Sequence, residues 1–342
     1  MKIFQRIFTG QVLSAMQVSC LKATTNVVAV ASRLPFALSI IAVVCCTQSK
    51  LSAQSDTVAR GLQYVRDAGE RWIDKRGCVS CHQVPSMIWA HEAAKRAGHD
   101  VSGELLEKWN RWSTDVVNFV KPEQKADCDP VATMASNIDT MTAMLLAIPP
   151  DGEAQWRKTF ADQLVAEQAE DGSWKACGQL PLQNRPPLET HAATTLWTSL
   201  ALLTENVAFQ QDEAIAFADQ VSDAKSIEWY AARLLVCDVV GDQRKQELQQ
   251  RLLDLQNEDG GWGWIAEEPS DAFGTGLALY ALSRVQTDPE PLNQARRYLT
   301  STQTKSGRWS VPGTKKSAKG KPTATASDWG SAWAVIALAE SE

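Results

Sequence analysis

Residues 256–262 read Gln256-Asn-Glu-Asp-Gly-Gly-Trp262. The same pattern, Gln-x-x-x-Gly-x-Trp, occurs at Gln168–Trp174 and at Gln303–Trp309. The glutamines at positions 168, 256 and 303 are spaced by 88 and then by 47 residues. This spacing fits a repeat of about 44 residues in which one copy of the motif has been lost. The sequence is therefore organised as repeats, and the fold follows from the repeating unit.

A helical stretch lies on each side of the motif. Amphipathic stretches precede it, as in 153–168 and 243–256, where apolar residues return at helical spacing. Stretches richer in small and apolar residues follow it at 190–203, 272–282 and 329–339. The second set is more apolar, so we expect it to be more deeply buried. Each repeat is predicted to be a helical hairpin with an outer and an inner helix.

The period also extends to parts of the chain that lack the motif. Counting backward reaches Gln124 and then the segment Cys78–His82, which precede helical stretches at 137–148 and 85–97. Another pair, 212–220 and 227–239, lies where the motif has been lost. We therefore expect six hairpins whose inner helices close into a ring. An open helical solenoid, which needs capped ends, is the alternative.

The repeated motif resembles the signature of the squalene–hopene and oxidosqualene cyclases, over about residues 56–341. The resemblance implies an all-α fold, the α/α toroid of terpenoid cyclases and protein prenyltransferases. It also implies that the motif is structural: Gln bonds to exposed backbone, Gly permits a tight turn and Trp packs on the next repeat. The structural residues would then be Gln168, Trp174, Gln256, Trp262, Gln303 and Trp309.

The acidic cluster that performs catalysis in those cyclases, Asp-x-Asp-Asp-Thr, is missing from this sequence. The nearest segment, Ser270–Thr275, retains the single carboxylate Asp271. Protonation of an alkene needs a strongly acidic carboxyl held by its neighbours, so Asp271 is a weak catalytic candidate. The chain has half the size of a triterpene cyclase, and the zinc-ligand pattern of the prenyltransferases is not found. Whether the protein is an enzyme stays open.

Cys78-Val-Ser-Cys81-His82 has the order and spacing of covalent c-type haem attachment. In such sites two thiols bind the vinyl groups of the haem, here Cys78 and Cys81, and the adjacent His82 would ligate the iron. The alternatives are a local disulfide, a vestigial motif, or a zinc site. Zinc would need a fourth ligand, for which Cys128 and Cys177 are candidates.

The second face of a haem would be covered by a residue outside this motif, or left open. His191 is our first candidate. Met87 and His91 on the following helix, and Met134 and Met141 on a neighbouring hairpin, are alternatives.

All inner helices are expected to begin at the same end of the ring as the haem motif. Polar residues at this end are explained either as helix caps or as an acidic mouth; they are Asp139, Glu189, His191, Glu228, Asp271 and Asp328. Beneath them would lie a core or a cavity lined by Trp89, Trp197, Trp229, Phe273 and Trp333.

Residues 1–53 contain five basic residues, no acidic residue and an apolar run from Leu34 to Cys46. This pattern predicts a signal peptide that is cleaved near residues 51–53, because the run is shorter than the roughly 20 residues of a spanning helix. A membrane anchor and a lipoprotein are the alternatives. Residues 54–342 would form one toroid domain, with 313–325 as an inserted loop. The protein is expected to be periplasmic or secreted, and to meet a membrane only through an uncleaved signal segment.

The formal net charge of −6 argues against nucleic acid as a partner. We expect an exported haem protein that transfers electrons or oxidises a small or lipophilic substrate, with a redox partner protein. Two other classes fit the sequence. One is a terpenoid-cyclase-like enzyme that acts on an isoprenoid without haem, and the other is a non-catalytic periplasmic binding protein.

Overall fold

The computed structural model describes residues 36–79, 82–150, 154–176, 185–313, 315–318 and 320–341. Residues 54–342 form one compact unit and residues 1–53 another. Within the described ranges the regular structure is helical, with three isolated β-bridges and no strand. The all-α expectation is confirmed. Among the described residues, no helix combines the length and the apolar character that a membrane span needs.

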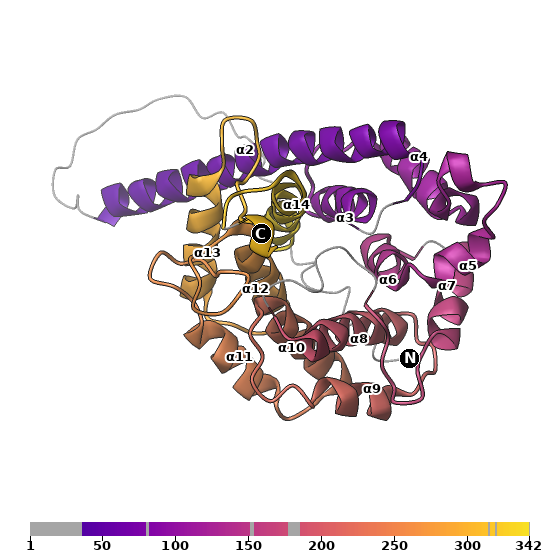
Figure 1. Cartoon of the computed structure of the whole chain (residues 1–342). Coiled ribbons are helices and arrows are strands. Elements are labelled where there is room, and N and C mark those ends of the chain that lie inside the picture. Colours follow the sequence, from indigo (N-terminus) through magenta and orange to yellow (C-terminus); the bar gives the residue numbers. More distant parts are fainter. Residues whose placement is uncertain are drawn as a thin grey trace. The chain divides into compact units, whose positions relative to one another are not determined.

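The inner helices of the toroid unit form a closed ring (Figure 1). Each packs against the next, and the last packs against the first. This closure confirms the ring and rules out the open solenoid. In order around the ring the inner helices are α3 (Gln83–Arg96), α6 (Ile138–Ala147), α8 (Pro187–Thr204), α10 (Ile227–Val240), α12 (Ala272–Arg284) and α14 (Ala324–Glu340).

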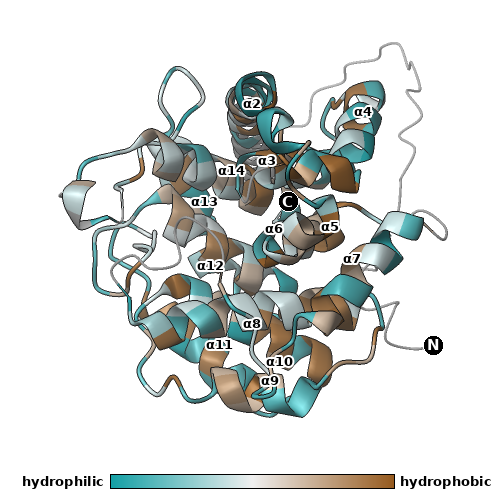
Figure 2. Ribbon diagram, turned by 45° about the vertical axis from the view of Figure 1, so that its right-hand side comes forward, coloured by the Kyte–Doolittle hydropathy of each residue, from teal (hydrophilic) through white to brown (hydrophobic). Residues whose placement is uncertain are grey.

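Outer helices surround this ring and complete the six predicted hairpins. They are amphipathic, as the hydropathy colours of α4 show (Figure 2). In α13, for example, Leu292, Ala295 and Leu299 are buried at helical spacing. The outer helices are α2 (Phe36–Arg76, here from residue 54 onward), α4 (Gly103–Ser113), α7 (Gln155–Ala166), α9 (Gln211–Ala218), α11 (Lys245–Asp254) and α13 (Pro289–Thr302).

Short helical segments lie in two of the connections. The second hairpin carries η1 (Val116–Phe119), η2 (Pro122–Gln124) and α5 (Pro130–Ala135) between α4 and α6. The last hairpin carries η3 (Lys316–Ala318) before α14. Helix α14 begins at Ala324, inside the loop expected at 313–325, because Thr323 caps it by accepting a bond from the backbone N–H of Ala326.

The three Gln-Gly-Trp motifs join each hairpin to its neighbours. Trp262 donates from Nε1 to the carbonyl of Leu252 at 2.8 Å, and its backbone N–H donates to the Thr275 hydroxyl at 2.9 Å. Gln256 donates to the carbonyl of Pro291 at the start of the next outer helix at 3.0 Å. The other two copies make the corresponding bonds. These contacts fit the structural role that the resemblance implied.

The last copy closes the ring. Gln303 donates to the carbonyl of Thr57 on α2 at 2.9 Å. Gly307 has a φ of 80°, and a Cβ there would lie 2.1 Å from the carbonyl oxygen of Arg60. Only glycine permits this left-handed turn so close to another backbone.

An ion-pair network around one buried arginine lies where the motif has been lost. Arg233 on α10 is 1% exposed and donates to Asp219 at 2.9 Å and to Asp242 at 3.2 Å. Arg244 also binds both carboxylates. Since Asp219 follows α9 and Asp242 precedes α11, the network joins α9, α10 and α11. Its four residues follow no repeat or motif, so the network was not predicted from the sequence.

Candidate functional site

The haem-attachment motif lies in the turn between α2 and α3. Helix α2 ends at Arg76 and α3 begins at Gln83, so this turn occupies the place of the Gln-Gly-Trp turn in the first hairpin. Gly77 starts the turn with a φ of 60°, and a Cβ there would lie 2.5 Å from Cγ of Pro122. Cys78 and His82 are described, whereas Cys81 lies outside the described residues.

Two contacts hold the backbone around Cys78. Trp72 on α2 donates from Nε1 to the carbonyl of Cys78 at 3.0 Å. The next residue, Val79, donates its N–H to the carbonyl of Asn118 in η1 at 2.7 Å. The Cys78 thiol is free and buried, and burial raises its pKa. It is therefore protonated at neutral pH in this structure.

His82 is the last residue before α3 and is buried. Its ring lies near two indoles, with centroids 6.2 Å from Trp72 and 5.8 Å from Trp329. Burial lowers the pKa of His82 to about 4, although the charge of Asp328 opposes the shift. The imidazole is therefore neutral near pH 7, which is the form that ligates metals.

Asp328, in the first half of α14, connects the elements around His82. It accepts a bond from the Tyr64 hydroxyl on α2 at 2.5 Å and another from the Gln83 amide on α3 at 3.2 Å. Burial, together with the bond to Asp328, raises the pKa of Tyr64, so the phenol stays a donor. The last helix of the ring, α14, thus meets the first two, α2 and α3, at this site.

The candidates for the second haem face are spread over the helices α3, α5, α6 and α8. His191 lies on α8, which α6 separates from α3, and it faces the charge of Asp171. His91 contacts the carbonyl of Met87 through Nδ1 at 2.7 Å and packs against Trp109 of the outer helix α4. The side chain of Met87 points toward α2: its sulfur would lie 2.3 Å from a Cβ added at Gly69. Met134 and Met141 are buried.

Asp271 is the N-cap of α12. Its Oδ1 accepts bonds from the N–H groups of Phe273 at 2.7 Å and Gly274 at 2.8 Å, and its Oδ2 accepts one from Trp264 at 2.8 Å. Burial raises the pKa of Asp271 to about 6, and the three backbone bonds oppose that shift. Both oxygens are used in the local fold, which favours the capping explanation.

The other polar residues at this end of the ring also have structural partners. Glu189 on α8 binds the backbone just before α10, since it accepts bonds from the N–H groups of Lys225 at 2.8 Å and Ser226 at 2.7 Å. Glu228 pairs with Arg185 at 2.7 Å. Asp139 accepts a bond from the Thr194 hydroxyl at 3.0 Å.

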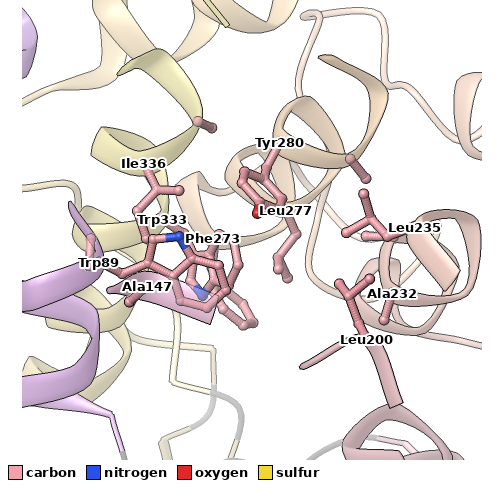
Figure 3. Close-up of a cluster of buried hydrophobic side chains, with 14 of the residues drawn as sticks. Trp89, Ala147, Leu200, Ala232, Leu235, Phe273, Leu277, Tyr280, Trp333 and Ile336 are labelled. Atoms are coloured by element: carbon pink, nitrogen blue, oxygen red, sulfur yellow. The ribbon is translucent and has the colours of Figure 1, made fainter. Parts of the chain in front are cut away.

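Two layers of aromatic side chains occupy the inside of the ring. Deeper along the helices, Trp89 contacts Trp333 at 5.2 Å, Tyr280 at 5.9 Å and Trp197 at 6.2 Å between ring centroids. Figure 3 shows Trp89 and Trp333 on one side of this cluster and Leu200 and Leu235 on the other, with Tyr280 and Leu277 of α12 between them. The four rings come from α3, α8, α12 and α14.

The second layer lies nearer the N-termini of the inner helices. Phe273 contacts Trp329 at 5.0 Å and Trp264 at 6.1 Å, and Trp329 contacts His82. Trp264 and Trp329 were not foreseen from the sequence. For Trp329 a signal existed, since it precedes Trp333 by four residues and therefore shares its face of α14.

The zinc alternative depends on residues beyond the described ones. No group of three or more His, Cys, Asp or Glu residues within the described ranges could hold a metal ion. Cys128 is free and partly buried in the connection that follows η2. Cys81 and Cys177 fall in segments whose placement is not described.

No known protein-family model matches the chain. A segment of 65 residues is 38% identical to protostadienol synthase A from Neosartorya fischeri, and covers 19% of this chain and 9% of that protein. Among solved structures, a type II terpene cyclase from Scytonema, in complex with geranylgeranyl dihydroxybenzoate, is similar with a TM-score of 0.53 and 10% identity. The likeness covers 86% of this chain and 99% of the cyclase.

An unsaturated glucuronyl hydrolase specific for heparin is similar with a TM-score of 0.57 and 10% identity, over 85% of this chain and 97% of the hydrolase. These likenesses show the fold: the protein is an α/α toroid, a fold shared with a terpene cyclase and with a glucuronyl hydrolase. Since cyclases and hydrolases share this fold, the fold by itself selects neither activity.

Proposed function

We propose that the protein is an exported c-type haem protein on a terpenoid-cyclase-like toroid, which exchanges electrons with a redox partner protein or oxidises a small or lipophilic substrate. The observation that carries the proposal is the position of Cys78–His82. Three other connections between outer and inner helices carry the structural Gln-Gly-Trp motif, whereas this turn carries two thiols and an imidazole.

The residues at the turn fit the chemistry of a covalently bound haem. The Cys78 thiol is free, and the buried, neutral imidazole of His82 suits an iron ligand. Cys78 and Cys81 would hold the porphyrin, and His191 stays a proposed ligand for the second face. Haem supplies one-electron transfer when it is bound.

The neighbouring residues have two roles in this proposal. Trp72 and Trp329 flank His82 and exclude water from it. Asp328 keeps a negative charge near the imidazole, and Tyr64 and Gln83 fix its carboxylate in place. A nearby carboxylate strengthens a histidine ligand and tunes the potential of its metal.

A terpenoid-cyclase-like activity is the second candidate, favoured by the fold and by the aromatic interior. It requires a carboxyl that can donate a proton to an alkene. Asp271 is the nearest counterpart, and its oxygens accept three backbone bonds. Because both oxygens already accept backbone bonds, Asp271 is a weak proton donor in this second proposal.

Covalent haem attachment is the decisive test. The full chain is produced in a bacterium that exports and matures c-type cytochromes, and denaturing gels are stained for haem peroxidase activity. We expect staining of the wild type, loss of staining in Cys78→Ala and Cys81→Ala, and full staining in the matched control Cys128→Ala. The proposal is wrong if Cys78→Ala stains as strongly as the wild type. It is also wrong if the wild type stays unstained while a cytochrome made in the same cells is stained.

A further inference from the structure

Three buried tryptophans differ in their hydrogen bonding from those of the Gln-Gly-Trp motifs. The indole N–H groups of Trp89, Trp229 and Trp264 are buried and have no acceptor. The scaffold tryptophans differ, because Trp174, Trp262 and Trp309 each donate to a backbone carbonyl. Buried donors are nearly always paired in native proteins, so three unpaired indoles in one domain indicate a missing acceptor.

The three indoles belong to the inside of the ring. Trp89 is part of the deeper aromatic layer. Trp264 packs on Phe273 in the other layer, and its carbonyl accepts the N–H of Ile227 at the start of α10. Trp229 lies one turn before Ala232 on the same face of α10, and Figure 3 shows Ala232 facing the interior cluster.

Several side chains of the ring interior keep a small exposed fraction. Trp333 and Leu235 are each 6% exposed although they face the middle of the ring, whereas Trp174 and Trp262 in the scaffold are 0% exposed. Trp89 and Trp229 keep 5% and 7%. A small molecule inside the ring would therefore meet aromatic walls and indole donors.

The charged groups near these donors are already paired. Arg185 binds Glu228 at 2.7 Å and lies over the ring of Trp264 at 5.4 Å. Asp271 is bound by backbone N–H groups. A carboxylate ligand is disfavoured, because Arg185 is already paired with Glu228. A pure hydrocarbon is disfavoured as well, because it would leave the indole N–H groups without an acceptor.

We propose that the interior of the ring binds a flat, apolar small molecule whose polar atoms are hydrogen-bond acceptors, of the ketone or quinone class. The donors are the indole N–H groups of Trp229 and Trp264, with Trp89 deeper in the ring. This binding site does not depend on the attachment of haem, so it stands or falls separately from the proposed function.

Two probes of the same shape test the proposal on the purified full chain. One is 2,3-dimethyl-1,4-naphthoquinone, which cannot alkylate thiols because both ring carbons beside its carbonyls are methylated. The other is 2,3-dimethylnaphthalene, which lacks the two acceptors. Equilibrium dialysis should show at least about tenfold tighter binding of the quinone, as expected when two acceptors each gain a bond. Equal binding of both probes, or binding of neither, overturns the proposal.

Variants then locate the donors. Trp229→Phe and Trp264→Phe keep an aromatic ring and remove the N–H, so each should weaken quinone binding about threefold to tenfold and leave hydrocarbon binding unchanged. Trp156→Phe on the outer helix α7 is the matched control. If both variants bind the quinone as the wild type does, the indoles are not the donors. The comparison of the two probes on the wild type remains decisive if a variant does not fold.

Discussion

Gln303 in the last hairpin donates a hydrogen bond to the backbone carbonyl of Thr57 at 2.9 Å, and thereby ties the end of the repeat array to its beginning. Its Oε1 also accepts bonds from Arg60 on α2, the shorter at 2.8 Å. The ring is thus closed by the same contact that joins consecutive repeats.

Gln303→Ala should lower the free energy of unfolding by about 2 kcal/mol, because it removes these bonds and leaves backbone groups unpaired. Urea unfolding measured by circular dichroism tests this. The control is Gln250→Ala, since Gln250 donates to Asp254 on the exposed side of α11 and should change stability by less than about 0.5 kcal/mol. Equal stability of the two variants would show that the closing contact is dispensable.

Arg233→Ala should cost about 3 kcal/mol, because it leaves the carboxylates of Asp219 and Asp242 with an incomplete set of partners beside a new cavity. Arg111→Ala is the matched control, since that arginine pairs with Glu107 on the surface and its side chain is 75% exposed. Chemical denaturation of both variants gives the comparison. A cost for Arg233→Ala no larger than for Arg111→Ala would contradict the assigned role of the network.

His91 should make stability fall as the pH falls. Burial lowers its pKa to about 4, although the Met87 carbonyl opposes the shift. Below pH 6.5 the unfolded chain takes up a proton that the native protein does not accept until about pH 4. The stability present above pH 6.5 is therefore lost progressively between pH 6.5 and 4, by about 1.4 kcal/mol per pH unit.

This pH effect is measured as the difference in unfolding free energy between the wild type and His91→Gln, since the other titrating groups cancel in that difference. The unfolding free energy of the wild type should fall relative to that of His91→Gln as the pH is lowered from 6.5 to 4. A difference that is constant across this range would show that His91 titrates alike in both states.

Asp271→Asn should destabilise the fold by about 1–2 kcal/mol, because asparagine retains one acceptor oxygen for three backbone donors. Asp288→Asn is the control, since Asp288 is the N-cap residue of α13 but its side chain makes no capping bond. Thermal unfolding distinguishes the two. Unchanged stability combined with loss of turnover of an isoprenoid would instead assign Asp271 to catalysis.

The repeat period was enough to predict the arrangement of helices. The apolar stretch at 190–203 became α8, with bounds 187–204, and the stretch at 212–220 became α9, with bounds 211–218. Such predictions succeed because burial at helical spacing is recorded directly in the order of residues. The Arg233 network was missed because ion pairs between separate turns leave no periodic signal.

The candidate site was likewise predicted only in part from the sequence. Cys78, Cys81 and His82 lie within five residues, so the sequence alone indicates a haem-attachment motif. The side chains around His82 come from distant positions: Trp72 lies on α2, and Asp328 and Trp329 lie on α14. The unpaired indoles of Trp229 and Trp264 are also invisible in the sequence, because pairing depends on which carbonyls the fold brings near.

The sequence by itself determined the repeat, the count of six hairpins and the turn that carries the haem-attachment motif, because these depend on local spacing. The closure of the ring decided the environment of His82. By bringing α14 against α3 and α2, it buried His82 between two indoles, and burial then set its charge state. Desolvation and long-range packing are properties of the assembled ring, and the order of residues does not specify them one position at a time.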